Sequence, residues 1–400
     1  MNETKDTKGS WKERRNTIKC WWQLPFVFIE WICEQMSAFF KQLAFFDVLE
    51  YGGRLGLLVS FVVGVFFYVT EADERRMQAE DQKKAKHYQA WQIINAAQGK
   101  EGSRGRKDAL QDLNNDNVSL AGVDISKAII PDLNLVKADL WRANLSSAEL
   151  DDANFFDANL NMANLCGVKL RKANLCKTKF SEANLSDATL WTAVMIDANL
   201  PNAILTRANL RNAVLTNAIL PHADLTESDL TDAMLNNANL LRAILIGADL
   251  TDANLSGAQL DQADLTDANL PNANLTKSDL SDAELNNSNL INAILVGAEL
   301  ADANLHGAKL IEANLSETNL YRTKLSNANL TGANLCNANL LYIRHWTDIK
   351  SIEYANIYGV KNAPEGFIKW AEDHGAKSNI SNPHEWLEWK RQKMQEIKSQ

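Results

Sequence analysis

The side chains in this sequence that could support catalysis or bind a metal are its cysteines and histidines. Five cysteines are present, an odd number, and none are paired as C-x-x-C, the spacing typical of zinc sites. The six histidines are scattered, and the closest pair in the folded region is His374 and His384. No nucleophile elbow, phosphate loop or zinc signature occurs. The sequence therefore predicts a protein that is not an enzyme and that needs no metal and no cofactor.

Aspartate is abundant and could in principle serve as a general acid or base, but it recurs in a fixed pattern. In the stretch LTDANLSGAQLDQADLTDANL, residues 250–270, leucine stands at every fifth position and Asn or Asp often precedes it. The repeat therefore dictates an Asn or Asp beside each leucine, whatever chemistry the protein performs. We interpret these side chains as surface positions of a repeating element, not as catalytic groups.

The five-residue rhythm predicts the local backbone. From Leu120 to Leu340 it runs through 45 pentapeptides without an insertion, with leucine central in 40 and alanine two positions earlier in 35. A period of five fits neither an amphipathic helix nor a half-buried strand. In extended chain, residues two apart point the same way, so Ala and Leu face inward and the residue between them faces outward. The two remaining residues are turn formers. Each pentapeptide should be a short extended side followed by a bend.

This pattern resembles the pentapeptide-repeat family, whose motif A-(D/N)-L-X-X is carried here by ADLTDANL and ANLSGAQL. The resemblance implies a mainly β fold, a right-handed quadrilateral parallel β-helix with four pentapeptides per coil. About eleven coils at ~4.8 Å each would make a rod on the order of 50 Å long, filled by Leu and Ala. The segment AWQIINAAQG also resembles one that precedes the repeats in some membrane-linked members, so the chain resembles a membrane-anchored member of the family.

A membrane segment precedes the repeats. Residues 51–70 read YGGRLGLLVSFVVGVFFYVT, and Arg54 is the only charged residue among them. About twenty apolar residues suffice to cross a bilayer as a helix, so the stretch predicts a transmembrane helix in contact with membrane lipid. Within residues 20–50, apolar side chains recur every three or four positions. That stripe fits either an amphipathic helix in the headgroup zone or a second membrane helix.

Basic residues orient this segment. Several lysines and arginines follow it closely, whereas near its other end there are only Lys41, before it, and Arg54, close to its start. Positive charge favours the cytoplasmic side, so we expect an integral membrane protein whose repeat domain faces the cytoplasm. The basic N-terminal tail, residues 1–19, suits a hairpin with both ends inside or an interfacial helix. The basic residues after the segment are Arg75, Arg76, Lys83, Lys84 and Lys86.

The repeats need a cover at each end, because open strand edges invite aggregation. A helical stalk is predicted to end near Gly99, and the short helix after it, over Arg104–Leu113, is the predicted N-terminal cover. At the other end, Pro364 and Gly375 bracket a predicted capping helix. The tail after it is predicted to be a loose basic helix. The remaining predicted segments are 71–115 for the stalk helix and N-terminal cap, 116–340 for the β-helix, 341–378 for degenerate repeats and the capping helix, and 379–400 for the C-terminal tail.

The outer faces are then the candidate binding surfaces. If a coil takes twenty residues, apolar residues that replace Asn or Asp line up on one side, with Ile294 and Val296 further along. A second apolar group on another side contains Pro201, Ile219, Pro221 and Leu241. Exposed apolar patches often mark contact surfaces. The predicted partner surface is Phe156, Val194, Ile196, Val214 and Met234.

Charge excludes one class of partner and suggests another. The chain carries 41 Lys+Arg and 50 Asp+Glu, and 27 acidic and 15 basic residues lie between Asp116 and Leu340. This acidic balance argues against direct nucleic-acid binding. The favoured function is a membrane-anchored scaffold that binds an unidentified protein partner or forms a homo-oligomer. The alternative, implied by the family resemblance, is a DNA-mimicking binder of a topoisomerase or other DNA-binding protein. Its predicted acidic cluster is Asp229, Asp232, Asp249 and Asp252.

Overall fold

The computed structural model describes residues 31–36, 51–103 and 105–398 of the 400-residue chain. The predicted basic tail at 1–19 lies outside the described residues, and so does most of the segment predicted at 20–50, of which residues 31–36 are helical. Tertiary contacts divide the chain into two compact units, 1–88 and 89–400.

Helix α3, Tyr51–Ala96, is one continuous helix of 46 residues. It contains both the predicted transmembrane segment and most of the predicted stalk. Within the part of the chain that the structure describes, α3 is the one helix long and apolar enough to cross a membrane, judged by length and composition over Gly56–Ala96. Its apolar side chains are exposed, Phe67 by 65% for example. Glu71 and Arg75 form an ion pair one turn apart, at 2.5 Å.

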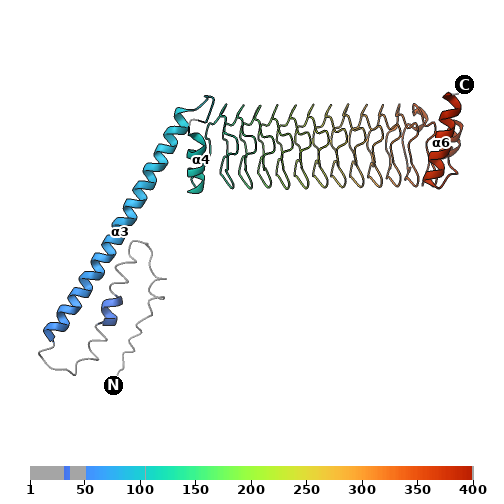
Figure 1. The fold of residues 1–400 in the computed structure, drawn as a ribbon. Coiled ribbons are helices and arrows are strands. Elements are labelled where there is room, and N and C mark those ends of the chain that lie inside the picture. The colour runs from blue at the N-terminus through green and yellow to red at the C-terminus, as the bar shows by residue number, and fades with distance from the viewer. Residues whose placement is uncertain (1–30, 37–50, 104, 399–400) are drawn as a thin grey trace, which may run out of the picture. The chain divides into compact units, whose positions relative to one another are not determined.

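The repeats form a four-sided coil. Parallel bridges join residues twenty apart, such as Val194 with Val214 and Val214 with Met234, so four pentapeptides make one coil. Each side contributes one bridge residue, and the described residues contain no strand longer than such a single residue. The coils stack along one axis, with helix α4, Arg106–Asn115, at one end and helix α6, Pro383–Lys398, at the other (Figure 1). The right-handed sense of winding stays a prediction.

Each corner consists of two residues that lie in the middle of a four-residue turn. The second corner residue, which is the third residue of the turn, has positive φ. At Asn212 φ is 55°, and at Asp232 it is 58°. The turn that contains Asn212 is closed by a hydrogen bond from the N–H of Ala213 to the carbonyl of Leu210, at 2.9 Å. A positive φ at the third residue of a turn is the type II arrangement, which Asn, Asp and Gly adopt most readily. These backbone demands explain why the two non-core residues of each repeat are drawn from turn formers.

The interior is filled by the Leu and Ala side chains that the rhythm predicts. Leu215, Leu220 and Ala218 are fully buried, and Phe155 is accommodated in the same core. Where serine or threonine replaces alanine, its hydroxyl donates to a backbone carbonyl, as Ser228 does to Leu225 at 2.7 Å. A buried hydroxyl would be destabilising without such an acceptor. The core therefore runs unbroken along the coil.

The N-terminal end of this core is covered by two helices. Helix α4, Arg106–Asn115, buries Leu110 and Leu113 against the first coil, and Ile94 from the last turns of α3 joins the same core. Arg106 is fully buried. Its guanidinium donates to the carbonyls of Ala97 (3.0 Å) and Lys100 (2.8 Å), and also to that of Gly102. This side chain ties the end of α3 to the start of α4.

The coil continues beyond the uninterrupted repeats. After Arg344 three bridges join residues 22 apart, as in Asn329 with Ser351, because helix η2, Trp346–Asp348, adds length to one corner. Helix α5, Phe367–Asp373, then covers the last coil with Phe367 and Ala371. Gly375, at φ 90°, follows it as the sequence predicts.

The tail forms helix α6, Pro383–Lys398, which is docked on the coil and is not the loose helix expected from the sequence. Trp386 is 5% exposed, and its indole Nε1 donates to the carbonyl of Tyr354 at 3.0 Å. Lys390 forms an ion pair with Glu312 and lies 4.3 Å from the centre of the Trp386 ring. The partners lie far upstream in the chain, so only the folded coil brings them to the helix.

Candidate functional site

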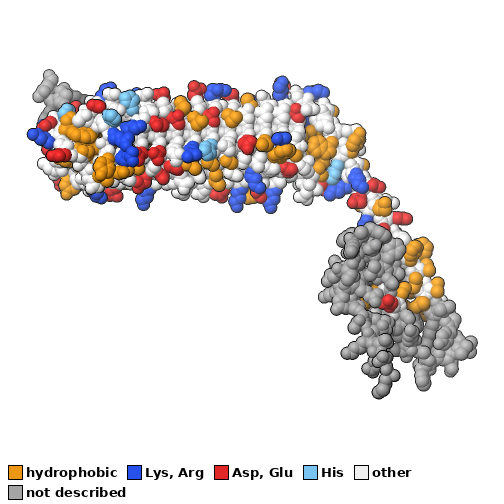
Figure 2. Space-filling view, turned by 180° about the vertical axis from the view of Figure 1, so that it is seen from behind, with side chains coloured by type: hydrophobic (Ala, Val, Ile, Leu, Met, Phe, Trp, Pro, Cys, Tyr) orange, Lys and Arg blue, Asp and Glu red, His pale blue; other side chains and the backbone are white. Residues whose placement is uncertain are grey.

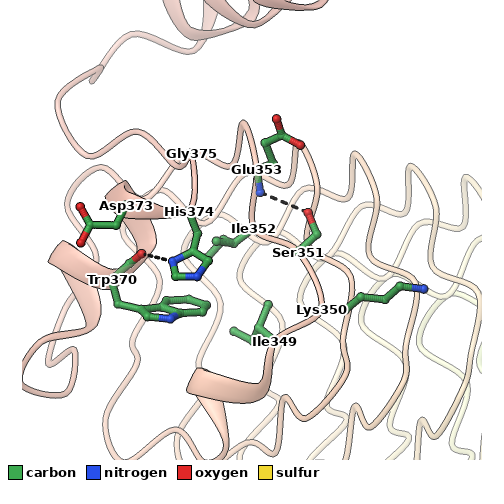
Figure 3. Close-up of a pocket in the computed structure, with 9 residues that line it drawn as sticks. All are labelled: Ile349, Lys350, Ser351, Ile352, Glu353, Trp370, Asp373, His374 and Gly375. Atoms are coloured by element: carbon green, nitrogen blue, oxygen red, sulfur yellow. Dashed lines mark hydrogen bonds between the residues drawn. The ribbon is translucent and has the colours of Figure 1, made fainter.

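A depression of about 400 Å³ lies beside α5, but its side chains do not converge (Figure 3). His374 stacks on Trp370 with ring centres 4.4 Å apart. Asp373 and Lys350 point away from this stack on opposite sides (Figure 3). Among the described residues, no group of three His, Cys, Asp or Glu side chains could hold a metal ion. The outer sides of the coil are therefore the better candidates for a functional surface.

The Asn or Asp in the middle of each side has a structural task. Its side-chain oxygen accepts a hydrogen bond from the backbone N–H two residues later, as Asn174 does from Cys176 (3.2 Å) and Asn254 does from Ser256 (3.1 Å). This is an Asx turn, which stabilises the following corner. Neighbouring amides also join between coils, for example Asn274 to Asn254 at 3.3 Å. From the sequence these residues were interpreted only as surface positions, although their constant place before a turn was a usable signal.

One side departs from this rule in three successive coils. Val194, Val214 and Met234 occupy the middle positions, joined by parallel bridges, and we call them the apolar column. Asn174 and Asn254 lie immediately before and after it. Met234 is 44% exposed, and the two valines are half-buried. None of the three can accept the hydrogen bond that an Asn or Asp accepts at this position.

The structure places the other two predicted residues differently. Ile196 stands at the corner that follows Val194 and is half-buried there. Phe156 stands at the equivalent corner two coils earlier, with the ammonium of Lys177 5.9 Å from its ring centre. Trp191 is 42% exposed at the corner that precedes Val194 and is not among the residues predicted from the sequence. Thus Ile196 and Trp191 flank the apolar column, whereas Phe156 lies apart from it.

Apolar residues on the other sides are interrupted. In one middle column Ile204 and Ile244 are separated by Asp224, and in another Ile219 lies between Asn199 and Asn239. Figure 2 shows the same pattern on the face it draws, where apolar side chains form separate patches among charged ones. The apolar column is therefore the longest uninterrupted run of apolar middle residues in the described coils.

The predicted acidic residues do lie together, and each has a partner. Asp229 and Asp249 are bridged neighbours in one column. Asp232 lies 3.9 Å from Arg211, and Asp252 accepts a hydrogen bond from Asn272 at 3.0 Å. Burial raises the pKa of Asp249, but hydrogen bonds from Thr251 and Asn269 outweigh burial and hold that pKa below its usual value. Asp229 and Asp249 also accept hydrogen bonds from the backbone N–H groups of Thr231 and Thr251, so these two carboxylates brace corners of the coil.

Comparisons with known proteins agree with the repeat. A sequence model of the family described as pentapeptide repeats matches the chain in overlapping segments that cover residues 134–282 and 283–340. A comparison with curated protein sequences gave no match.

Three solved structures illustrate the similarity. HetL, a pentapeptide repeat protein involved in heterocyst differentiation regulation from the cyanobacterium Nostoc sp. strain PCC 7120, is 32% identical over 53% of this chain and 88% of its own, with a TM-score of 0.21. Rfr23 from the cyanobacterium Cyanothece 51142 is 38% identical over 21% of this chain and 54% of its own, with a TM-score of 0.19. QnrB1, a plasmid-mediated fluoroquinolone resistance protein, is 13% identical over 54% of this chain and 95% of its own, with a TM-score of 0.27.

Proposed function

Because this chain belongs to the pentapeptide-repeat family, we propose that it is a membrane-anchored scaffold that binds a protein partner through the outer sides of its coil and performs no catalysis. The observation that carries this proposal is the apolar column Val194, Val214 and Met234 on an exposed side. Contiguous exposed apolar surface rimmed by polar residues is typical of contact sites.

The column is not a chance occurrence of surface apolar residues. In three successive coils it lacks the hydrogen bond that a middle Asn or Asp accepts from the next corner. The Asn residues before and after it, Asn174 and Asn254, each accept a hydrogen bond from the backbone of the next corner. A typical hydrogen bond of this kind stabilises a protein by about 1 kcal/mol. Single apolar residues on a surface need no explanation, but three stacked ones that replace a stabilising residue support a binding role.

Helix α3 supplies the proposed membrane anchor. Its apolar half ends at Thr70, and the following turns carry Arg75 and Arg76. Basic residues that follow a crossing favour the cytoplasmic side, and this preference supports a coil that faces the cytoplasm. Protease added to sealed spheroplasts should leave the repeat region intact, and protease added after detergent should reach it. Digestion of the repeats in sealed spheroplasts would contradict this orientation.

Partner binding can be tested by charging the column. Val194→Asp combined with Val214→Asp should abolish capture of the partner, because a buried unpaired carboxylate in an interface is strongly unfavourable. The coil itself should stay folded, since these side chains point outward from the core. Ile204→Asp, on the opposite side, is the matched control and should leave capture unchanged. Capture is measured by crosslinking in intact membranes, and undiminished capture by the double variant would refute the role of the column.

The same crosslinking assay distinguishes the scaffold from the alternative, a DNA-mimicking binder, when acidic residues are changed. The stacked carboxylates of Asp229 and Asp249 favour it, whereas Arg211 beside Asp232 interrupts the negative surface. Asp229→Asn combined with Asp249→Asn removes two charges and keeps the oxygens that brace the corners. A scaffold that binds through the apolar column should tolerate this pair of changes. A DNA mimic should lose its partner, because its binding depends on negative charge.

A further inference from the structure

We propose that the partner seated on the apolar column is a second copy of this chain, packed side by side with its coils parallel and level with those of the first. The inference rests on the proposed function and names the partner of the same surface. It draws on residues at the corners beside the column, which the proposed function does not use.

Two coils on this side carry the same apolar triad. In the first, Trp191 and Ile196 stand at the two corners and Val194 lies between them; in the second, Ile291, Ile294 and Val296 occupy the equivalent positions five coils later. Trp191 is 42% exposed, Ile294 is 41% exposed, and the remaining corner residues are half-buried. At ~4.8 Å per coil the triads are about 24 Å apart, with Val214 and Met234 between them.

A two-fold axis parallel to the coil axis would match these residues. Such an axis sets each middle residue opposite its own counterpart, so Val214 meets Val214 and Met234 meets Met234. In each coil it also sets the corner before the middle residue of one copy opposite the corner after the middle residue of the other copy. Trp191 then meets Ile196, and the corner pair of the second triad, Ile291 and Val296, meets in the same way. Buried tryptophan is among the commonest anchors of protein interfaces.

Antiparallel packing fits less well. Centred on Val214, it sets Arg211 opposite Arg211, and like charges across an interface are strongly unfavourable. Centred midway between the triads, it sets Asp232 opposite Asp252 and Val214 opposite Asn274. The parallel arrangement avoids these pairs along the whole stretch between the triads. The residue pattern therefore selects one orientation of the second copy.

The size of this surface sets the expected strength. Six coils of one side offer on the order of 400 Å² per copy, below the ~800 Å² per partner that stable interfaces bury. Dimerisation should therefore be weak in free solution. Confinement of both copies to one membrane raises their effective concentration, which is where we expect the dimer to form.

Crosslinking of the full chain in isolated membranes tests the proposal. The native cysteines are changed to serine, Val214→Cys is introduced, and a short bis-maleimide is added. Ile204→Cys, at an exposed middle position on the opposite side, is the matched control. We expect the dimer fraction of Val214→Cys to exceed that of the control by about tenfold, because only the first pair is held together. Equal dimer fractions, or no dimer, would overturn the inference.

Two further arms fix the orientation and guard against misfolding. Val194→Cys and Ile294→Cys should each link to themselves, and co-expression should give no 194–294 product; that product would show antiparallel packing. In chains that keep all native cysteines, energy transfer between two fluorescent fusions should be lost with Val214→Asp and kept with Ile204→Asp. A Val214→Cys adduct with a different protein, without dimer, overturns this inference and leaves the proposed function standing. No adduct of any kind counts against both.

Discussion

Replacing Leu220 with alanine should lower the free energy of unfolding of the coil by about 2–5 kcal/mol. Leu220 is fully buried in the middle of the coil, in the same interior column as Leu200 and Leu240. Its backbone N–H donates to the carbonyl of Asn239 in the next coil at 2.7 Å, so the backbone cannot move inward to fill the space. The cavity left by the missing side chain therefore persists, and its destabilising effect adds to the lost burial.

The neighbouring residue provides the control. Ile219 belongs to the same side of the same coil but points outward and is 43% exposed. Ile219→Ala removes a similar number of carbon atoms and should change stability by no more than about 0.5 kcal/mol. Urea unfolding followed by circular dichroism measures both variants. Similar midpoints for the two would contradict a filled interior.

Replacing Arg106 with methionine should lower stability at the N-terminal end by about 3 kcal/mol, because a hydrogen bond that involves a charged group contributes about 1.5–3 kcal/mol. Methionine fills much of the volume but cannot donate to the carbonyls of Ala97, Lys100 and Gly102, which Arg106 holds at present. The carbonyl of Ala97 would keep a hydrogen bond from the backbone N–H of Lys100, but all three carbonyls would lose the guanidinium, and the link between α3 and α4 would open. In this variant the hydrogen-exchange rate of the α4 amides should increase, and it should increase much more than the rate of the amides in the central coils.

Lys100→Met is the matched control for Arg106→Met. It removes one positive charge from the same segment, but Lys100 is exposed and its ammonium donates only to the carbonyl of Ala96, at 2.8 Å. Exchange in α4 should be close to that of the unaltered protein. If both variants opened α4 equally, net charge would be responsible, and the buried guanidinium would have no special role.

The core could be predicted from the sequence because it depends on one local rule, repeated. Leu at every fifth position and Ala two before it are buried wherever the chain is extended between corners, so Leu215 and Ala218 were assigned correctly without any tertiary information. The role of the middle Asn and Asp was available from the same rule but was overlooked. An acceptor placed two residues before a turn N–H is a recurrent local motif.

Features that depend on distant contacts were harder to predict. Helix α6 looks like a loose basic tail until the coil places Glu312 and Tyr354 beside Lys390 and Trp386. Trp191 was missed because its corner becomes part of the candidate surface only after the side that carries Val194 is defined. The apolar column itself needed the twenty-residue coil, which came from the family resemblance and not from the period of five.

The constant spacing of the bridges has a consequence for how the chain acquires its structure. Every bridge between Asp124 and Arg344 joins residues only twenty apart, so each coil completes its pairing as soon as the next twenty residues are available. Contacts so close in sequence favour rapid folding. Helix α4 and the first coil leave the ribosome before the rest, which gives later coils a finished surface on which to wind. The domain should therefore assemble progressively during synthesis, from its capped N-terminal end toward α6.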